Sequence, residues 1–213
     1  DFSHLYARQQ GKIDYAKVRH LSREFYNSNS LARTAIDTKT TSIVNRGLML
    51  ESKPLVTPLH GITVPEDWSK NTEHRFDLWA SHKGADFCWQ QNFYQQQAEI
   101  FRDCLLHGRS FSIIRYSPDV KRGRIGRINL QTIHSSQLGT PIDLVFNDRK
   151  NGKIVSGCKF DKSGTLIGIY VKKSSDSSPD SSGYAYVPRW GSRTGRLNFI
   201  HILNGQFPGD HQG

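Results

Sequence analysis

The spacing of apolar positions along the chain changes near residue 108. Before this point, apolar side chains recur three or four residues apart, as in amphipathic helices; Val18, Leu21 and Phe25 form one such series. After it, apolar and polar residues alternate, which is typical of half-buried strands. The predicted helices cover residues 14–26, 30–45, 65–83 and 89–107, and the predicted strands cover residues 48–53, 110–116, 128–133, 153–160, 165–172, 184–187 and 197–203.

Polar and glycine-containing segments separate these elements. Residues 27–30 read Asn-Ser-Asn-Ser and should break the first two helices, because their short side chains bond nearby backbone N–H groups. Gly47 and Gly108 stand where the second and fourth helices should end, since glycine adopts the left-handed cap conformation without steric cost. Pro65 is expected at the first position of the third helix. Turns or loops are predicted at residues 55–64, 117–126, 161–164 and 174–183.

Aromatic residues at helical spacing are expected to face the core. Trp68, Phe76 and Trp79 share one face of the third predicted helix. Large aromatic side chains bury much apolar surface, so this spacing indicates packing rather than ligand binding.

This order of elements predicts an α+β fold, in which N-terminal helices pack against a C-terminal antiparallel β region. The length allows a sizeable core in one large domain or two small ones. We divide the chain into an N-terminal arm at residues 1–13, a helical part at residues 14–108 and an antiparallel β part at residues 109–213.

Positive charge is concentrated in the second half of the chain. The net charge is +10, but residues 1–104 hold 13 Lys and Arg against 12 Asp and Glu, whereas residues 105–213 hold 16 against 7. A basic surface suits contact with a polyanion, because phosphate neutralisation releases counterions. Ordinary solubility, or contact with an acidic neighbouring subunit, explains the same charge equally well.

The sequence contains none of the common motifs of enzyme chemistry. It has no P-loop and no GxGxxG, HExxH or GxSxG pattern. Cys88, Cys104 and Cys158 are far apart without a CxxC pair, which argues against zinc and disulfides. His74 and His82 lie two helical turns apart, too distant to share one metal ion. We therefore expect no enzyme activity, no metal and no cofactor.

Two acidic residues are a weaker candidate for chemistry. Asp143 and Asp148 flank an apolar run and could act as the carboxylates of a metal-dependent nuclease. Solubility at the edge of a strand explains them as well, and this alternative stays open at the level of the sequence.

The sharpest functional candidate is a basic turn between two predicted strands, with the sequence VKRGRIGR at residues 120–127. Cations on a turn can hold a phosphate backbone or dock against an acidic neighbour. Glycines at positions 123 and 126 would let the backbone approach closely. The turn lacks the aromatic residues that a stacking platform for single strands needs. The candidate nucleic-acid or inter-subunit contacts are Lys121, Arg122, Arg124 and Arg127.

Taken together, five segments resemble the lambda-type portal proteins of tailed bacteriophages. They carry, in order, the helix with its Asn-rich break, a tryptophan helix followed by a long helix that ends at a glycine, a strand with a polar turn, a Gly-centred hairpin, and an Ile-His strand with a closing loop. Arg109 departs from this pattern, because the family often has an acidic residue there, and the closing loop differs in residue order. The segments are residues 21–50, 76–114, 127–141, 153–173 and 197–213.

The resemblance implies a structural role. A portal is a ring, usually dodecameric, at one vertex of the capsid, and double-stranded DNA passes through it during packaging and ejection. Its implied partners are further copies of itself, the terminase large subunit, capsid and head-completion proteins, and the DNA. The implied location is the virion, after assembly in the bacterial host cytoplasm. The chain resembles the wing region of a prophage portal and is expected to be a fragment that stops before the channel-associated helices.

One alternative function comes from a different class. The basic half could belong to a stand-alone double-stranded DNA-binding module, and the isolated chain would then bind duplex DNA in a salt-dependent manner.

Overall fold

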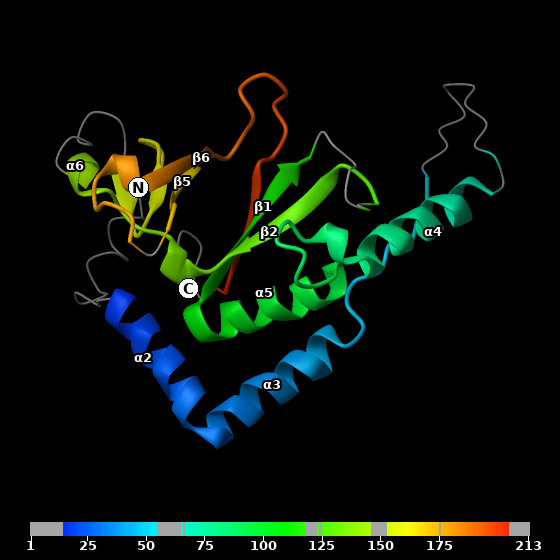
Figure 1. Ribbon diagram of the computed structural model, residues 1–213, viewed down its shortest axis with the longest axis horizontal. Helices are drawn as coiled ribbons and strands as arrows, with labels where there is room; N and C mark the ends of the chain where they lie inside the picture. The colour runs from blue at the N-terminus through cyan, green and yellow to red at the C-terminus, as the bar shows by residue number, and fades with distance from the viewer. Residues whose placement is uncertain are drawn as a thin grey trace.

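The computed structural model describes residues 15–54, 65, 67–117, 123, 125–145, 153–174 and 176–204. Helices dominate the first half and antiparallel strands the second, which confirms the predicted α+β class (Figure 1). The long helices are α2 (Tyr15–Ser28), α3 (Ser30–Val44), α4 (Trp68–Ser81) and α5 (Phe93–His107), and none of the described helices is long and apolar enough to cross a membrane. The strands are β1 (Arg109–Tyr116), β2 (Ile128–Ile133), β3 (Lys153–Val155), β4 (Cys158–Phe160), β5 (Leu166–Lys172), β6 (Tyr184–Pro188) and β7 (Phe199–Leu203).

The break between α2 and α3 is a single residue. The side chain of Asn29 accepts hydrogen bonds from the backbone N–H groups of Leu31 and Ala32 and so caps α3. This confirms the predicted break. Helix α2 nevertheless continues to Ser28, because only one capping residue is needed to start the next helix.

The predicted strand at residues 48–53 is wrong. Its backbone bonds to helix side chains instead of to another strand. The N–H of Leu48 donates to Gln97 Oε1 at 2.6 Å, and Gln97 Nε2 donates back to the Leu48 carbonyl oxygen at 3.4 Å. The N–H of Ser52 donates to Glu73 Oε1 at 2.7 Å. The segment is therefore an extended connection held against α5 and α4.

Helices α4 and α5 both begin later than predicted. Pro65 lies before α4, which starts at Trp68, and the Trp68 N–H donates to the Pro65 carbonyl oxygen. The start of α5 is delayed because the carboxylate of Asp86 accepts the N–H groups of Cys88 and Gln90, which holds this segment in a turn.

The cap residues of α5 explain where the helix begins and ends. Asn92 and Gln95 form a reciprocal capping box at its start. At its end, Gly108 has φ 77°, as predicted from the left-handed cap.

Two antiparallel sheets make up the β region. The first has the strand order β2-β1-β7 and the second has the order β3-β4-β5-β6. The predicted single strand at residues 153–160 is divided into β3 and β4 by a turn at Ser156 and Gly157, which both have positive φ. The predicted turn at residues 161–164 is confirmed, because Asp161 accepts hydrogen bonds from the N–H groups of Ser163 and Thr165.

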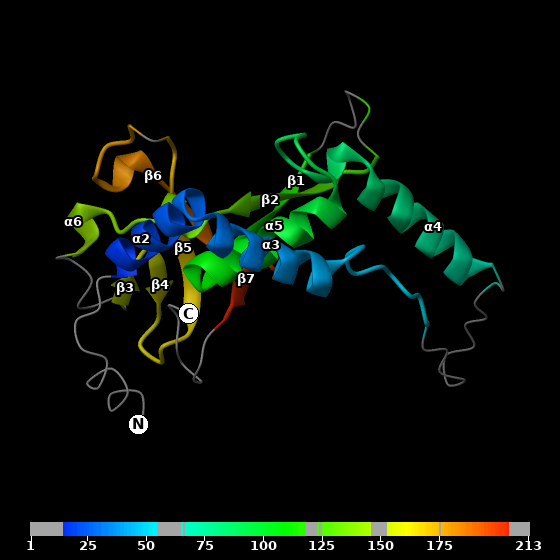
Figure 2. The same ribbon diagram turned by 90° about the horizontal axis from the view of Figure 1, so that it is seen from below.

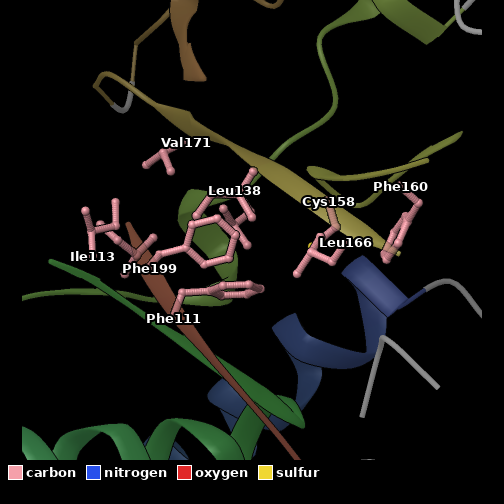
Figure 3. Close-up of a cluster of buried hydrophobic side chains, with 10 residues drawn as sticks. Phe111, Ile113, Leu138, Cys158, Phe160, Leu166, Val171 and Phe199 are labelled. Carbon is pink, nitrogen blue, oxygen red and sulfur yellow. The ribbon is translucent and has the colours of Figure 1, made fainter. Parts of the chain in front are cut away.

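The main apolar core lies between the two sheets (Figure 3). Helix α5 covers the other face of the three-stranded sheet, and α2 and α3 pack on the outer side of α5 (Figure 2). The sequence of layers is therefore outer helices, α5, first sheet and second sheet. The core residues are Phe111, Ile113, Ile133, Leu138, Cys158, Phe160, Leu166, Ile169, Val171 and Phe199.

Candidate functional site

The basic turn connects β1 to β2. The two ends of the turn are joined by a hydrogen bond of 2.8 Å from the Ser117 N–H to the Arg127 carbonyl oxygen. The exposed Arg127 guanidinium donates to the Tyr116 hydroxyl at 3.1 Å. The structure thus places one of the four predicted cations at the base of the turn, while Lys121, Arg122 and Arg124 lie outside the described residues.

The aromatic face of α4 supports the strand that follows this turn. The indole Nε1 of Trp79 donates to the Ile128 carbonyl oxygen at 2.9 Å. Trp79 also packs against Phe76 and Phe93, with ring centroids 5.6 and 5.2 Å away. The predicted packing role of Phe76 and Trp79 is confirmed, whereas Trp68 is 43% exposed and does not belong to the core.

Helix α2 turns its apolar stripe outward. Val18, Leu21 and Phe25 are 51%, 52% and 58% exposed. The inner side of the helix is polar: Ser22 Oγ donates to the Leu106 carbonyl oxygen of α5, and the Tyr26 hydroxyl donates to Asp37 of α3. An apolar stripe on the outside of an amphipathic helix is typical of a surface that contacts another protein. We call Val18, Leu21 and Phe25 the α2 stripe.

A second exposed apolar surface follows α3. Leu48 and Met49 are 80% and 70% exposed, and Ile43 near the end of α3 is 58% exposed. Met49 also lines a shallow hollow beside α4, together with Leu50, Lys70, Glu73, His74, Phe76, Asp77 and Tyr94. We call Ile43, Leu48 and Met49 the post-α3 surface. Helix α3 has fifteen residues and is about 22 Å long, so the post-α3 surface lies about this far from the end of α3 that adjoins α2.

A charged cluster fixes α5 to the end of β2. His134 Nε2 lies 3.0 Å from Glu99 Oε1, and His134 Nδ1 lies 3.1 Å from Asp103 Oδ1. Hydrogen bonds to Asp103 and Glu99 raise the pKa of His134 to about 10, so the imidazole is positively charged at neutral pH. The hydrogen bond from His134 in turn lowers the pKa of Glu99. Both imidazole nitrogens contact carboxylates, so the cluster is a structural contact between α5 and the end of β2. No group of three or more His, Cys, Asp or Glu side chains that could bind a metal is found among the described residues.

Sequence reasoning missed this cluster. Glu99, Asp103 and His107 follow one another at intervals of four, which places them on one face of α5 and could have indicated a polar contact. Their partner His134 comes from another element, so the sequence alone did not show the pairing.

Arg109, where the sequence departs from the resembled pattern, is fully buried. Its Nη2 donates to the Ser156 carbonyl oxygen at 3.0 Å, and its Nη1 lies 3.4 Å from Cys158 Sγ. Burial lowers the pKa of its guanidinium. This arginine joins the two sheets, because Ser156 and Cys158 belong to the β3–β4 hairpin.

Two of the other residues considered as catalytic or metal-binding candidates, Asp143 and His82, accept hydrogen bonds from backbone N–H groups. Asp143, on the short helix α6 (Ile142–Val145), accepts a hydrogen bond of 2.8 Å from the Ser181 N–H, and Asp148 lies outside the described residues. His82 Nδ1 accepts the Gly84 N–H, and His74 is exposed on α4. All three cysteines are free thiols. These contacts form no metal centre among the described residues, and the pairing of Asp143 with Asp148 falls outside the part of the chain that the structure describes.

A comparison with known families covers almost the whole chain. Residues 6–213 match the family described as phage portal protein, lambda family. No curated protein matches the chain. The match includes all five segments that carry the resemblance in the sequence, up to the last residue of the chain. The chain therefore belongs to the lambda family of phage portal proteins.

Proposed function

We propose that this chain is a structural subunit of a homo-oligomeric portal ring at the capsid vertex, through which double-stranded DNA is packaged and ejected. The family match over residues 6–213 is the observation that carries the proposal. Members of this family are structural proteins of the phage virion, so the proposal needs no catalytic centre.

The proposal includes finer points that follow from the family. The ring is a dodecamer that assembles in the bacterial host cytoplasm, binds the terminase large subunit and contacts capsid and head-completion proteins. The helical part (residues 14–108) and the β part (residues 109–213) together form its wing-like region. The Arg127 end of the basic turn belongs to the contacts of this ring, either with DNA or with a neighbouring subunit.

The two exposed apolar surfaces are candidates for the contacts between neighbouring subunits of the ring. A closed ring needs two different surfaces on each subunit, because each copy contacts its neighbours head to tail. The α2 stripe and the post-α3 surface lie at opposite ends of α3 and are both more than half exposed. We infer that one of them contacts the preceding subunit and the other contacts the following subunit.

The test is a pair of substitutions in the α2 stripe, Leu21→Asp together with Phe25→Asp. Because both side chains are already more than half exposed, the fold should survive, as circular dichroism will show. Two buried charges in a subunit contact should shift the sedimentation coefficient from that of the ring to that of a monomer.

Ile142→Asp is the matched control, since Ile142 is 56% exposed on α6, in the β part of the chain. It should sediment with the wild-type ring. A wild-type chain that stays monomeric and binds duplex DNA would instead favour the stand-alone DNA-binding module.

A further inference from the structure

The connection between β6 and β7 forms a second basic loop, which we call the basic arm (residues 189–198). In Figure 1 it projects from the sheets at the top of the view. Its two sides are joined by hydrogen bonds of 2.9 Å from the Asn198 N–H to the Arg189 carbonyl oxygen and 2.8 Å from the Gly191 N–H to the Arg196 carbonyl oxygen. Trp190 and Leu197 form an antiparallel bridge between these bonds. The arm is therefore a paired structure that holds its tip in one place.

The arginines of the arm have different surroundings. Arg189, at the base, lies over the Trp190 ring at 5.7 Å, and its Nη1 is 3.4 Å from the Leu166 carbonyl oxygen. Arg193 and Arg196 are exposed near the tip, and neither forms an ion pair with a carboxylate among the described residues. The sequence has no Asp or Glu from residue 181 to residue 209. The arm thus presents two positive charges with no acidic residue in the adjoining sequence to neutralise them.

The arm leaves the first sheet at the same end as the basic turn. Phe199 of β7 pairs with Ile113 of β1, and the Ile114 N–H donates to the Asn198 carbonyl oxygen at 2.9 Å. The base of the arm therefore lies beside the end of β1, which continues into the turn that contains Arg127. Two basic loops thus share one end of one sheet.

We propose that the basic arm binds the phosphate backbone of duplex DNA, with Arg193 and Arg196 as its phosphate contacts and Arg127 as part of the same surface. Guanidinium groups on a rigid loop suit phosphate oxygens, because charge-assisted hydrogen bonds form with little loss of side-chain freedom. This inference depends on the proposed portal function in one respect, which is that the portal function brings duplex DNA close to the protein.

A polyanion fits this arm better than a second copy of the chain. Residues 105–213 hold 16 Lys and Arg against 7 Asp and Glu, so the same half of a second copy offers the arm few acidic partners. The surfaces that we assign to contact between copies lie on α2 and after α3, whereas the arm lies on the sheets and carries a single exposed large apolar side chain, Trp190, beside the Arg189 guanidinium. The phosphodiester backbone supplies a negative charge at every nucleotide, which matches an arm with no acidic residue of its own.

The test measures how duplex binding depends on salt. The wild-type chain and Arg193→Gln with Arg196→Gln would be titrated against a fluorescent duplex at several salt concentrations. Each lost phosphate contact reduces the slope of log K against log salt by about 0.9, so the double variant should lose about 1.8.

Arg46→Gln with Arg75→Gln is the matched control, because it removes the same charge from exposed positions on the helical half. We expect its slope to equal that of the wild type. Equal losses in both double variants would mean general charge attraction and would overturn the proposal, as would an unchanged slope in the arm variant.

The sedimentation coefficient separates this proposal from the proposed function. The arm variant should still form wild-type rings. A variant that keeps the wild-type salt slope but fails to assemble would make the arm a contact between subunits and would overturn the DNA assignment. A wild-type chain that binds DNA through the arm without assembling would overturn the ring and leave the arm proposal standing.

Discussion

The two faces of the three-stranded sheet are buried by different chemistry. Toward the second sheet, Phe111 and Phe199 are almost fully buried in an apolar core. Toward α5, the alternating residues Ser110 and Ser112 are equally buried, and Asp103 of α5 is 3% exposed. One strand, β1, supplies both faces. The layer between the sheets is mainly apolar, with the Arg109 guanidinium bonded across it, whereas the layer toward α5 contains buried serines and the charged cluster of Glu99, Asp103 and His134.

This difference shows that burial alone does not define how a layer is stabilised. The apolar layer gains free energy mainly from apolar area removed from water, and this hydrophobic contribution does not depend on pH. The layer under α5 contains serine hydroxyls without a hydrogen-bond partner among the described residues. Unpaired buried hydroxyls cost free energy, and the charged cluster around His134 contributes a polar contact that joins α5 to the end of β2 in this layer. The two layers should therefore respond differently to substitution and to pH.

The largest effect is expected from the apolar layer. Phe111→Ala removes a fully buried ring between the sheets and should lower the free energy of unfolding by about 3–5 kcal/mol. Urea denaturation measures the change. Tyr116→Ala, at a 63% exposed position of the same strand, is the control and should cost about 1 kcal/mol or less. Similar losses in the two variants would contradict a core between the sheets.

A smaller effect is expected from the polar layer. His134→Gln leaves the buried carboxylate of Asp103 without its cationic partner and should cost about 2 kcal/mol, below the value for a fully buried pair because solvent reaches the imidazole. His20→Gln removes an exposed pair with Glu24 and should cost close to nothing. Urea denaturation measures both changes in the free energy of unfolding. Equal changes for the two variants would contradict a stabilising role of the cluster at α5.

The pH dependence should be the subtlest difference. The pKa of His134 is about 10 in the folded chain against an ordinary 6.5, so its stabilisation is complete below pH 6.5 and is lost as the pH rises toward 10. On the acid side, the lowered pKa of Glu99 and the pKa of His107, lowered by burial, both make stability fall as the pH decreases. The contribution of these groups should therefore be greatest near pH 6.5.

Thermal unfolding across this pH range provides the measurement. His134→Gln should remove the alkaline loss between pH 6.5 and 10, whereas Phe111→Ala should keep it at lower overall stability. An alkaline loss of equal size in both variants would assign it to other groups.

The same contrast explains what the sequence could predict. Alternation predicted β1, β2 and their pairing, because a strand with one apolar face has only one way to bury it. The strand predicted at residues 48–53 was wrong because Gln97, distant in sequence, takes the hydrogen bonds of its backbone. Periodicity found the α2 stripe but could not show that the stripe faces outward, since its inner neighbours bind through polar atoms.

The candidate site was predictable to a similar extent. The four clustered cations led to the basic turn, and the structure describes Arg127 at its base. The basic arm was missed. Arg193, Arg196 and the aromatic Trp190 lie in a stretch without acidic residues, and this pattern could have indicated a basic surface. Only the strand order showed that the arm and the turn lie at one end of the same sheet.

The most direct measurement of the central claim is the particle mass of the wild-type protein, combined with negative-stain images of the same sample. The account predicts closed rings of about a dozen copies with a central opening wide enough for duplex DNA. A monomer or a dimer at high protein concentration, without rings in the images, would contradict it.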